Sequence, residues 1–203
     1  MKCYPQLWLS FIFARWAFHC CFAAEMFDFE ELKNETRPFQ LQVMRLVCLD
    51  APYEETVLTL CRAFLRRNQP TLLRVTLEVP GLYNYVLLQF RLHYKFRTYQ
   101  PFLIDGEIDI CTFVKESKLD PVPSYIYNVM QEVAPDLSAP CPLGNKTFNV
   151  TTMFKVEYAP KSVPAGDYRM DIRVASRANV TLINFQVYVA VRRKGVLGSM
   201  LDW

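Results

Sequence analysis

The sequence predicts an all-β protein, an antiparallel β-sandwich with one short helix. Apolar and polar residues alternate through six or seven segments, which is typical of strands that bury one face. Turn sequences such as "VPGLYN", "YAPKSVPAGD" and "SRAN" separate these segments. Because 52% of the residues are hydrophobic and only six are glycine, the chain can bury a large core.

The N-terminal residues, which precede these segments, have the features of a secretory signal peptide. Lys2 is followed by an apolar run without acidic residues, and we expect cleavage after Ala23. A retained membrane anchor is the alternative, but Arg15 interrupts a run that is short of the ~20 apolar residues needed to cross a bilayer. The predicted organisation is a signal peptide over 1–23 and a single sandwich domain over 24–203 with a short C-terminal tail.

The mature chain is expected to be almost neutral. Without residues 1–23 it keeps 21 basic and 20 acidic residues. This balance favours neither nucleic acid nor strongly anionic lipid as a partner. The basic runs at 66–67 and 192–194 are therefore interpreted as solvated charges of loops and the tail.

The clearest predicted strand covers residues 86–97, with apolar side chains on one face and polar ones on the other. Its polar face carries Gln89, Arg91, His93, Lys95 and Arg97. The same alternation predicts strands at 39–43, 73–77, 154–158, 168–174 and 183–191. The segment 99–113 is predicted to be a core strand that carries Cys111.

One segment follows a helical period instead. In "DPVPSYIYNVMQEVAPD", Asp120 can cap the start, and prolines lie near both ends. Its apolar residues at helical spacing are Val122, Ile126, Val129, Met130 and Val133. A short amphipathic helix is predicted here, after the Cys111 strand, where it would cover one end or edge of the sandwich.

The cysteines that remain after the signal form an even set, which indicates two disulfides in a secreted protein. They are Cys48, Cys61, Cys111 and Cys141. Three connectivities are open from the sequence, and pairing of nearest neighbours gives two compact loops. A zinc site is the alternative, but no pair of cysteines has tight ligand spacing.

Four sequons for N-glycosylation support an extracellular location and predict a glycoprotein. Their asparagines are Asn34, Asn145, Asn149 and Asn179.

Asp105, Glu107 and Asp109 stand at alternate positions, so on a strand they share one face at a spacing of about 7 Å. A glycosidase pair needs one desolvated acid, and a hard-cation loop needs turn oxygens; neither signal is present. We interpret the three as an exposed acidic edge that discourages edge pairing.

His93, the only histidine of the mature chain, lies on a polar strand face and is predicted to be at the surface. Motifs for a nucleophile elbow, a phosphate loop or a zinc protease are missing from the sequence. The chain is therefore predicted not to be an enzyme, and to use no cofactor and no metal.

Fifteen Phe and eleven Tyr residues supply much of the apolar surface. They can fill the core, or the two sheets can leave a cavity for an apolar ligand. The predicted cavity lining is Phe90, Leu92, Phe96, Phe154, Val156, Tyr168, Met170, Phe185 and Val187. The pattern alone does not separate a filled sandwich from a hollow one.

The stretch "YQPFLIDGEIDICTFV" resembles the signature of the DUF1091 family of insect secreted proteins, close to "YxPFLxNxTxDxCxF". The matching residues are Tyr99, Pro101, Phe102, Leu103, Asp109, Cys111 and Phe113. The early cysteine pair, "CPLG" at Cys141, "PAGDYRMDIRV" and "VTLINFQVYVAV" also resemble family elements, so the resemblance covers about residues 40–192. The family's frequent Asn-x-Thr is replaced by "DGE", and the tail is longer.

DUF1091 proteins are similar to chemosensory B proteins and, more distantly, to MD-2-related lipid-recognition proteins such as the GM2 activator. The resemblance implies an immunoglobulin-like sandwich that opens around a ligand, and a disulfide from Cys111 to Cys141 that staples the helix. It implies a secreted, non-enzymatic carrier or presenter of a lipid, cuticular hydrocarbon or pheromone-like molecule, in a chemosensory setting. The alternatives are a solid interaction protein that engages a membrane receptor or channel, and an acid-dependent hydrolase.

Overall fold

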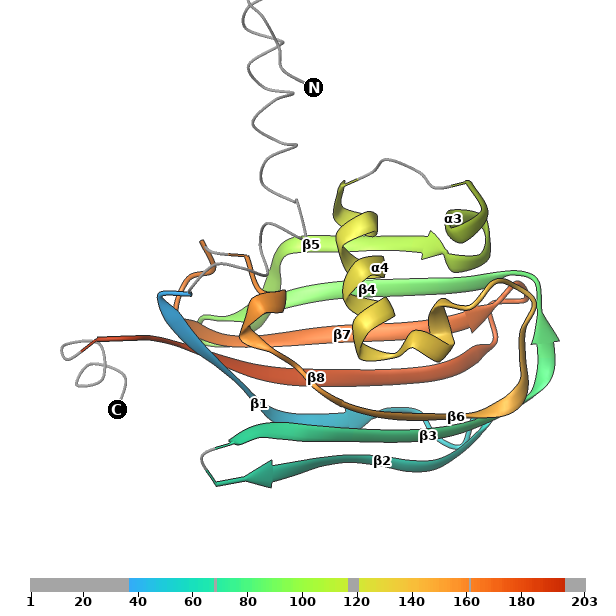
Figure 1. Cartoon of the computed structure of the whole chain (residues 1–203), viewed down its shortest axis with the longest axis horizontal. Coiled ribbons are helices and arrows are strands. Elements are labelled where there is room, and N and C mark those ends of the chain that lie inside the picture. Colours follow the sequence, from blue (N-terminus) through green and yellow to red (C-terminus); the bar gives the residue numbers. More distant parts are fainter. Residues whose placement is uncertain (1–36, 68, 117–120, 161, 196–203) are drawn as a thin grey trace, which may run out of the picture.

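The computed structural model describes residues 37–67, 69–116, 121–160 and 162–195, and within them two antiparallel sheets form the body of the protein (Figure 1). The larger sheet has the order β1 (Phe39–Cys48), β8 (Thr181–Arg193), β7 (Gly166–Ser176), β4 (Val86–Lys95) and β5 (Tyr99–Asp109). The smaller sheet has the order β2 (Val57–Arg66), β3 (Gln69–Tyr83) and β6 (Leu143–Met153). The predicted all-β sandwich is confirmed. The predicted signal peptide, Asn34 and most of the C-terminal tail lie outside the described residues.

Two strands were missed from the sequence, and one predicted strand is wrong. In β2 the pairing with β3 shifts register between Leu58 and Leu60, which hides the alternation. In β6 few residues are apolar, and threonine and asparagine stand between them. The alternation of apolar and polar residues is therefore too weak to predict the strand. The segment predicted as a strand at 154–158 instead contains the 3₁₀ helix η2 (Val156–Tyr158), because β6 ends at Met153.

The segment predicted as a core strand carrying Cys111 is also corrected. β5 is an edge strand that ends at Asp109, and the helix α3 (Ile110–Glu116) begins directly after it. The Asp109 carboxylate accepts hydrogen bonds from the backbone N–H groups of Cys111, at 3.2 Å, and Thr112, at 3.3 Å. An aspartate in this position caps the helix start. Cys111 therefore lies on a helix and not on the strand.

The second helix, α4 (Pro121–Val133), confirms the predicted amphipathic helix, and the 3₁₀ helix η1 (Pro135–Ser138) follows it. In Figure 1, α4 crosses in front of β5, β4 and β7, on the side of the sheet that also faces β6. Its apolar residues Val122, Ile126 and Met130 pack against the buried residues of β4. This helix thus fills the side of the sandwich between β5 and β6.

Both disulfides join nearest neighbours in the sequence. Cys48–Cys61 connects β1 to β2 and so links the two sheets. Cys111–Cys141 connects α3 to the segment before β6 and encloses α4 in the loop between its cysteines. On the same side as the first disulfide, the Thr71 hydroxyl donates to the Val43 carbonyl across the sheets. The sandwich is therefore closed along β1.

Candidate functional site

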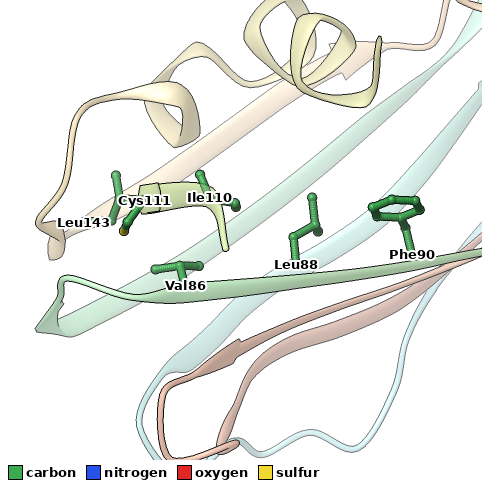
Figure 2. Packing of buried hydrophobic residues seen from close by; sticks show 6 residues of the cluster. All are labelled: Val86, Leu88, Phe90, Ile110, Cys111 and Leu143. Carbon is green, nitrogen blue, oxygen red and sulfur yellow. The ribbon is translucent and has the colours of Figure 1, made fainter. Parts of the chain in front are cut away.

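The inner face of β4 is tightly covered. Val86, Leu88 and Phe90 are 4%, 6% and 4% exposed. Figure 2 shows their side chains pointing toward Ile110 and Cys111 of α3 and toward Leu143 at the start of β6. Further residues of α4 pack on this cluster. This part of the interior is filled by the protein's own side chains.

The centre of the same sheet is covered less well. One cross-strand row runs through β1, β8, β7 and β4, and every member is only half-buried. This central row consists of Leu46, Val187, Met170 and Leu92. Inward residues on inner strands normally lose nearly all accessible surface, since protein interiors are close-packed. Their remaining accessible surface means that space at least as wide as a water molecule lies beside them.

The neighbouring inward positions share this property. Ile172, Phe185 and Val189 flank the central row on β7 and β8, and each is half-buried. In the other sheet, Val75 of β3 pairs with Val150 of β6, and both are half-buried although Leu73, Leu77 and Phe148 beside them are buried. Val187 and Val150 pack against none of the four buried clusters of the described residues. We call the space beside these half-buried side chains and the central row the central hollow.

The hollow is apolar, and aromatic residues close it at the end where β4 turns into β5. The rings of Tyr94 and Phe102 lie 5.4 Å apart, and those of Tyr94 and Tyr168 lie 5.1 Å apart. The Tyr168 hydroxyl donates to the Pro164 carbonyl at 2.8 Å, and burial raises the pKa of this tyrosine to about 12. Such a cluster buries large apolar area at this end and keeps its hydroxyls hydrogen-bonded.

A second pair of tyrosines fixes α4 beside the hollow. The hydroxyl of Tyr125, on α4, donates to the backbone carbonyl of Tyr158, on η2. Burial raises the pKa of Tyr125 to about 12, with a small opposing contribution from the Arg37 charge. The Tyr158 hydroxyl donates to the Glu132 carboxylate at 3.0 Å, so that each tyrosine links helix and loop.

The structure divides the nine residues predicted to line a cavity. Leu92, Met170, Phe185 and Val187 are half-buried inward residues, and among these four only Val187 packs against none of the buried clusters. The others pack elsewhere: Phe90 under α3 and α4, Phe154 against Tyr158, and Val156 and Tyr168 in the end cluster. Phe96 was placed wrongly, because β4 ends at Lys95 and the turn leaves its ring 64% exposed.

Sequence reasoning missed three lining residues, Leu46, Val75 and Val150. The register of β1 against β8 shifts between Val43 and Arg45, so that a count along the alternation places Leu46 on the wrong face. Val75 was recognised as an inward strand residue, but alternation does not indicate how closely the opposite layer packs. Val150 lies on β6, one of the two strands that the sequence did not predict.

The three acids do not form one site. Asp105 accepts from the Arg91 guanidinium at 2.8 Å, Glu107 accepts from the Gln89 amide at 3.1 Å, and Asp109 caps α3. The first two contacts join the edge strand β5 to its neighbour β4, and the third holds the start of α3. Among the described residues, no group of three or more His, Cys, Asp or Glu side chains is arranged to hold a metal ion.

His93 is not the surface histidine that the sequence predicts. Its neighbours on β5 and β7, Pro101 and Arg169, flank it, and it is only 7% exposed. Its Nδ1 lies 3.5 Å from the Asp171 carboxylate, which is too long for a hydrogen bond. That carboxylate is instead held by the Arg169 guanidinium at 2.7 and 2.8 Å.

Within the described residues, three of the four predicted glycosylation positions are exposed: Asn145, Asn149 and Asn179. An asparagine must be exposed to carry a glycan, and these three meet that requirement. Glycosylation itself stays a prediction. No helix of the described part is long and apolar enough to cross a membrane.

Comparisons with known proteins find no match among curated sequences. Among solved structures, the chain is similar to a Niemann-Pick type C2 protein from Japanese carpenter ant, with 13% identity, a TM-score of 0.36, and coverage of 70% of this chain and 96% of that one. It is also similar to chicken MD-1 complexed with lipid IVa, with 10% identity, a TM-score of 0.36, and coverage of 78% and 94%. At these scores neither likeness carries an argument about function.

A family model gives the more specific result. Residues 88–170 match the model described as "Protein of unknown function (DUF1091)". The matched segment begins in β4, contains both helices and the Cys111–Cys141 disulfide, and ends in β7. The match confirms the resemblance that the motif around Cys111 predicts, and from β4 into β7 the chain carries the sequence pattern of DUF1091.

Proposed function

We propose that this protein is a secreted, non-enzymatic carrier or presenter of a hydrophobic ligand, held between the two sheets in the central hollow. The observation that carries the proposal is the central row, four apolar side chains that remain half-buried across hydrogen-bonded strands. A ligand that covers them removes apolar surface from water, at about 25 cal/mol for each Å².

The chemistry of the walls indicates the ligand class. The central row and its flanking residues are all aliphatic or aromatic, and the charged side chains of β4, β5 and β7 lie on the opposite face of the sheet. A pocket of this kind binds long apolar molecules and selects among them by length and shape. A lipid, a cuticular hydrocarbon or a pheromone-like molecule fits this description, and delivery of such a ligand in chemosensory tissue is the proposed setting.

Secretion is part of the proposal. Two complete disulfides are typical of proteins that fold in an oxidising compartment. Exposed sequons agree with passage through the secretory pathway.

The test begins with protein secreted from eukaryotic cells. Mass spectrometry of its organic extract should find a co-purifying apolar molecule, and a fluorescent fatty acid should bind and be displaced by it. Val187→Trp should fill the hollow and abolish probe binding, whereas the control Val57→Trp, at a position 54% exposed on β2, should leave it unchanged. Met170→Phe provides a second, milder filling variant, and thermal unfolding checks that each variant folds.

The rival class, a solid interaction protein for a receptor or channel, predicts the opposite result. Extracts without lipid, together with a wild-type protein that does not respond to the probe, would rule out the carrier. Equal loss of probe binding in the Val187 and Val57 variants would place the probe outside the hollow and would also contradict the proposal.

A further inference from the structure

Large apolar side chains are exposed at the end of the molecule where β4 turns into β5, and along the edge strand β5 as far as the level of Leu92. Phe96 in this turn is 64% exposed, and Leu103 on β5 is 83% exposed. Leu103 has a φ of 59°, a left-handed conformation that is strained for leucine, and lies where the β4–β5 register is irregular. Leu65, next to the β2–β3 turn at the same end in Figure 1, is 63% exposed.

Several cations lie at the same end of the molecule. Arg97 lies in the β4–β5 turn, Arg67 in the β2–β3 turn, and Arg193 and Lys194 at the end of β8, which reaches the same end (Figure 1). All four are exposed, and none has an ion-pair partner within the described residues. The near-neutral balance of the whole chain conceals this local excess of positive charge.

Two of the acids toward this end are already engaged. Asp167 accepts from Arg192 at 2.7 Å and lies 3.7 Å from the Lys95 ammonium. Asp105, further along β5, is held by Arg91 at 2.8 Å. Within the described residues, the charges of the β2–β3 and β4–β5 turns and of the end of β8 that have no ion-pair partner are thus positive, and they lie at the same end of the molecule as Leu65 and Phe96.

We propose that this end docks on an anionic lipid bilayer. The docking end is defined by the apolar side chains of Leu65, Phe96 and Leu103 and the cations Arg67, Arg97, Arg193 and Lys194. Phe96, Leu65 and Leu103 enter the boundary between headgroups and acyl chains, while the cations contact lipid phosphates. This function goes beyond ligand carriage and does not depend on a molecule in the hollow.

The arrangement fits a bilayer better than it fits a protein or a soluble polyanion. A protein partner requires a contiguous complementary patch, but these apolar side chains stand singly on two separate turns and an edge strand. A soluble polyanion uses the cations and leaves the exposed Phe96 and Leu103 without a role. A bilayer accepts isolated apolar tips and needs no matched shape.

Of the four predicted glycans, the three within the described residues leave this end clear, and Asn34 lies outside those residues. Asn145 near the start of β6 and Asn179 in the β7–β8 turn lie at the opposite end in Figure 1. Asn149 is exposed within β6, away from the turns of the docking end.

The full secreted chain tests this proposal by flotation with vesicles. Binding should be at least about tenfold stronger to vesicles of roughly equal phosphatidylcholine and phosphatidylserine than to phosphatidylcholine alone, and should weaken with salt. The apolar variant, Phe96→Ser with Leu103→Ser, should lower binding about tenfold. The charge variant, Arg97→Glu with Arg193→Glu and Lys194→Glu, should lower it about a hundredfold or more.

Matched controls and a competing surface complete the experiment. Leu82→Ser with Val57→Ser removes residues that are 60% and 54% exposed away from the docking end and should bind like the wild type. Equal binding to neutral and anionic vesicles would overturn the proposal. An apolar variant that binds vesicles like the wild type would also overturn it. So would a charge variant that loses binding to heparin but not to vesicles, since either result indicates a soluble polyanion as the partner. Thermal unfolding confirms that each variant is folded.

Discussion

β4 and β8 belong to the same sheet and present similar apolar inner faces, but their surroundings differ. Val86, Leu88 and Phe90 of β4 are buried beneath α3, α4 and the start of β6, whereas Phe185 and Val187 at the centre of β8 remain half-buried. The difference does not lie in the strands. It arises because the segment between β5 and β6 folds into helices that pack on β4, whereas β8 faces the smaller sheet, against which its residues Ile183 and Phe185 pack.

The stapled helices explain why the filled half is fixed in place. Asp109 caps α3 where β5 ends, and Cys111–Cys141 ties α3 to the start of β6. The proposed function thus divides this sandwich into one compartment for its own side chains and one for a ligand between the two sheets.

The largest effect is expected in the filled compartment. Phe90→Ala should cost about 4 kcal/mol of unfolding free energy, because it removes a ring that is 4% exposed and leaves a cavity that the covering helices cannot close. Urea unfolding monitored by circular dichroism measures this cost. A loss below about 1 kcal/mol would mean that β4 is no better packed than β8.

The disulfide over the filled compartment should matter almost as much. Replacing both Cys111 and Cys141 by serine should cost about 3 kcal/mol, because a loop of 30 residues is no longer restricted in the unfolded chain. Hydrogen exchange should speed up in β4 and α4 more than in β8. Replacing Cys48 and Cys61 by serine is the matched control. If the Cys111 and Cys141 replacement raised hydrogen-exchange rates equally in all strands, the disulfide would not act specifically on the helices.

Tyr125 should make the cover of the sandwich sensitive to alkaline pH. Its pKa is about 12 in the folded protein and 10.0 when unperturbed, so the unfolded chain releases this proton first. Stability is therefore full below pH 10 and should fall by about 2 kcal/mol as the pH rises toward 12. Tyr125→Phe should flatten this decline in urea titrations, and Tyr127→Phe, on the same helix, should not.

The smallest effect provides the most direct comparison of the two compartments. Val86→Ala on β4 should cost about 2 kcal/mol, because it removes two buried methyl groups from a site that is 4% exposed. Val187→Ala, the same change in the half-buried central row, should cost less than about 1 kcal/mol in ligand-free protein. Equal costs in urea unfolding would show that the hollow is as tightly packed as the region under α4.

The sequence predicted the parts of the fold that depend on uninterrupted alternation. β4 was placed correctly because both of its neighbours pair with a regular pleat over most of its length. β2 was missed because its register shifts, and Cys111 was placed on a strand because the helix start depends on the Asp109 side chain. His93 was predicted at the surface because alternation identifies a face but not the neighbours that cover it.

The same limit applies to the candidate site. The alternation correctly predicted that four half-buried residues point inward, namely Leu92, Met170, Phe185 and Val187. It made the same prediction for Phe90, which is buried, and so did not distinguish the two kinds of inward residue. Only the three-dimensional path of residues 110–133 decides which inward residues are covered. A pattern local to each strand contains no information about that path.

The central row has one more physical consequence. In the proposed hollow, walls of valine, leucine and methionine enclose volume that unfolding eliminates. The ligand-free protein should therefore be unusually compressible and should unfold at lower hydrostatic pressure than the same protein after loading with an apolar guest. High-pressure fluorescence thus offers a way to detect an occupant before its chemical identity is known.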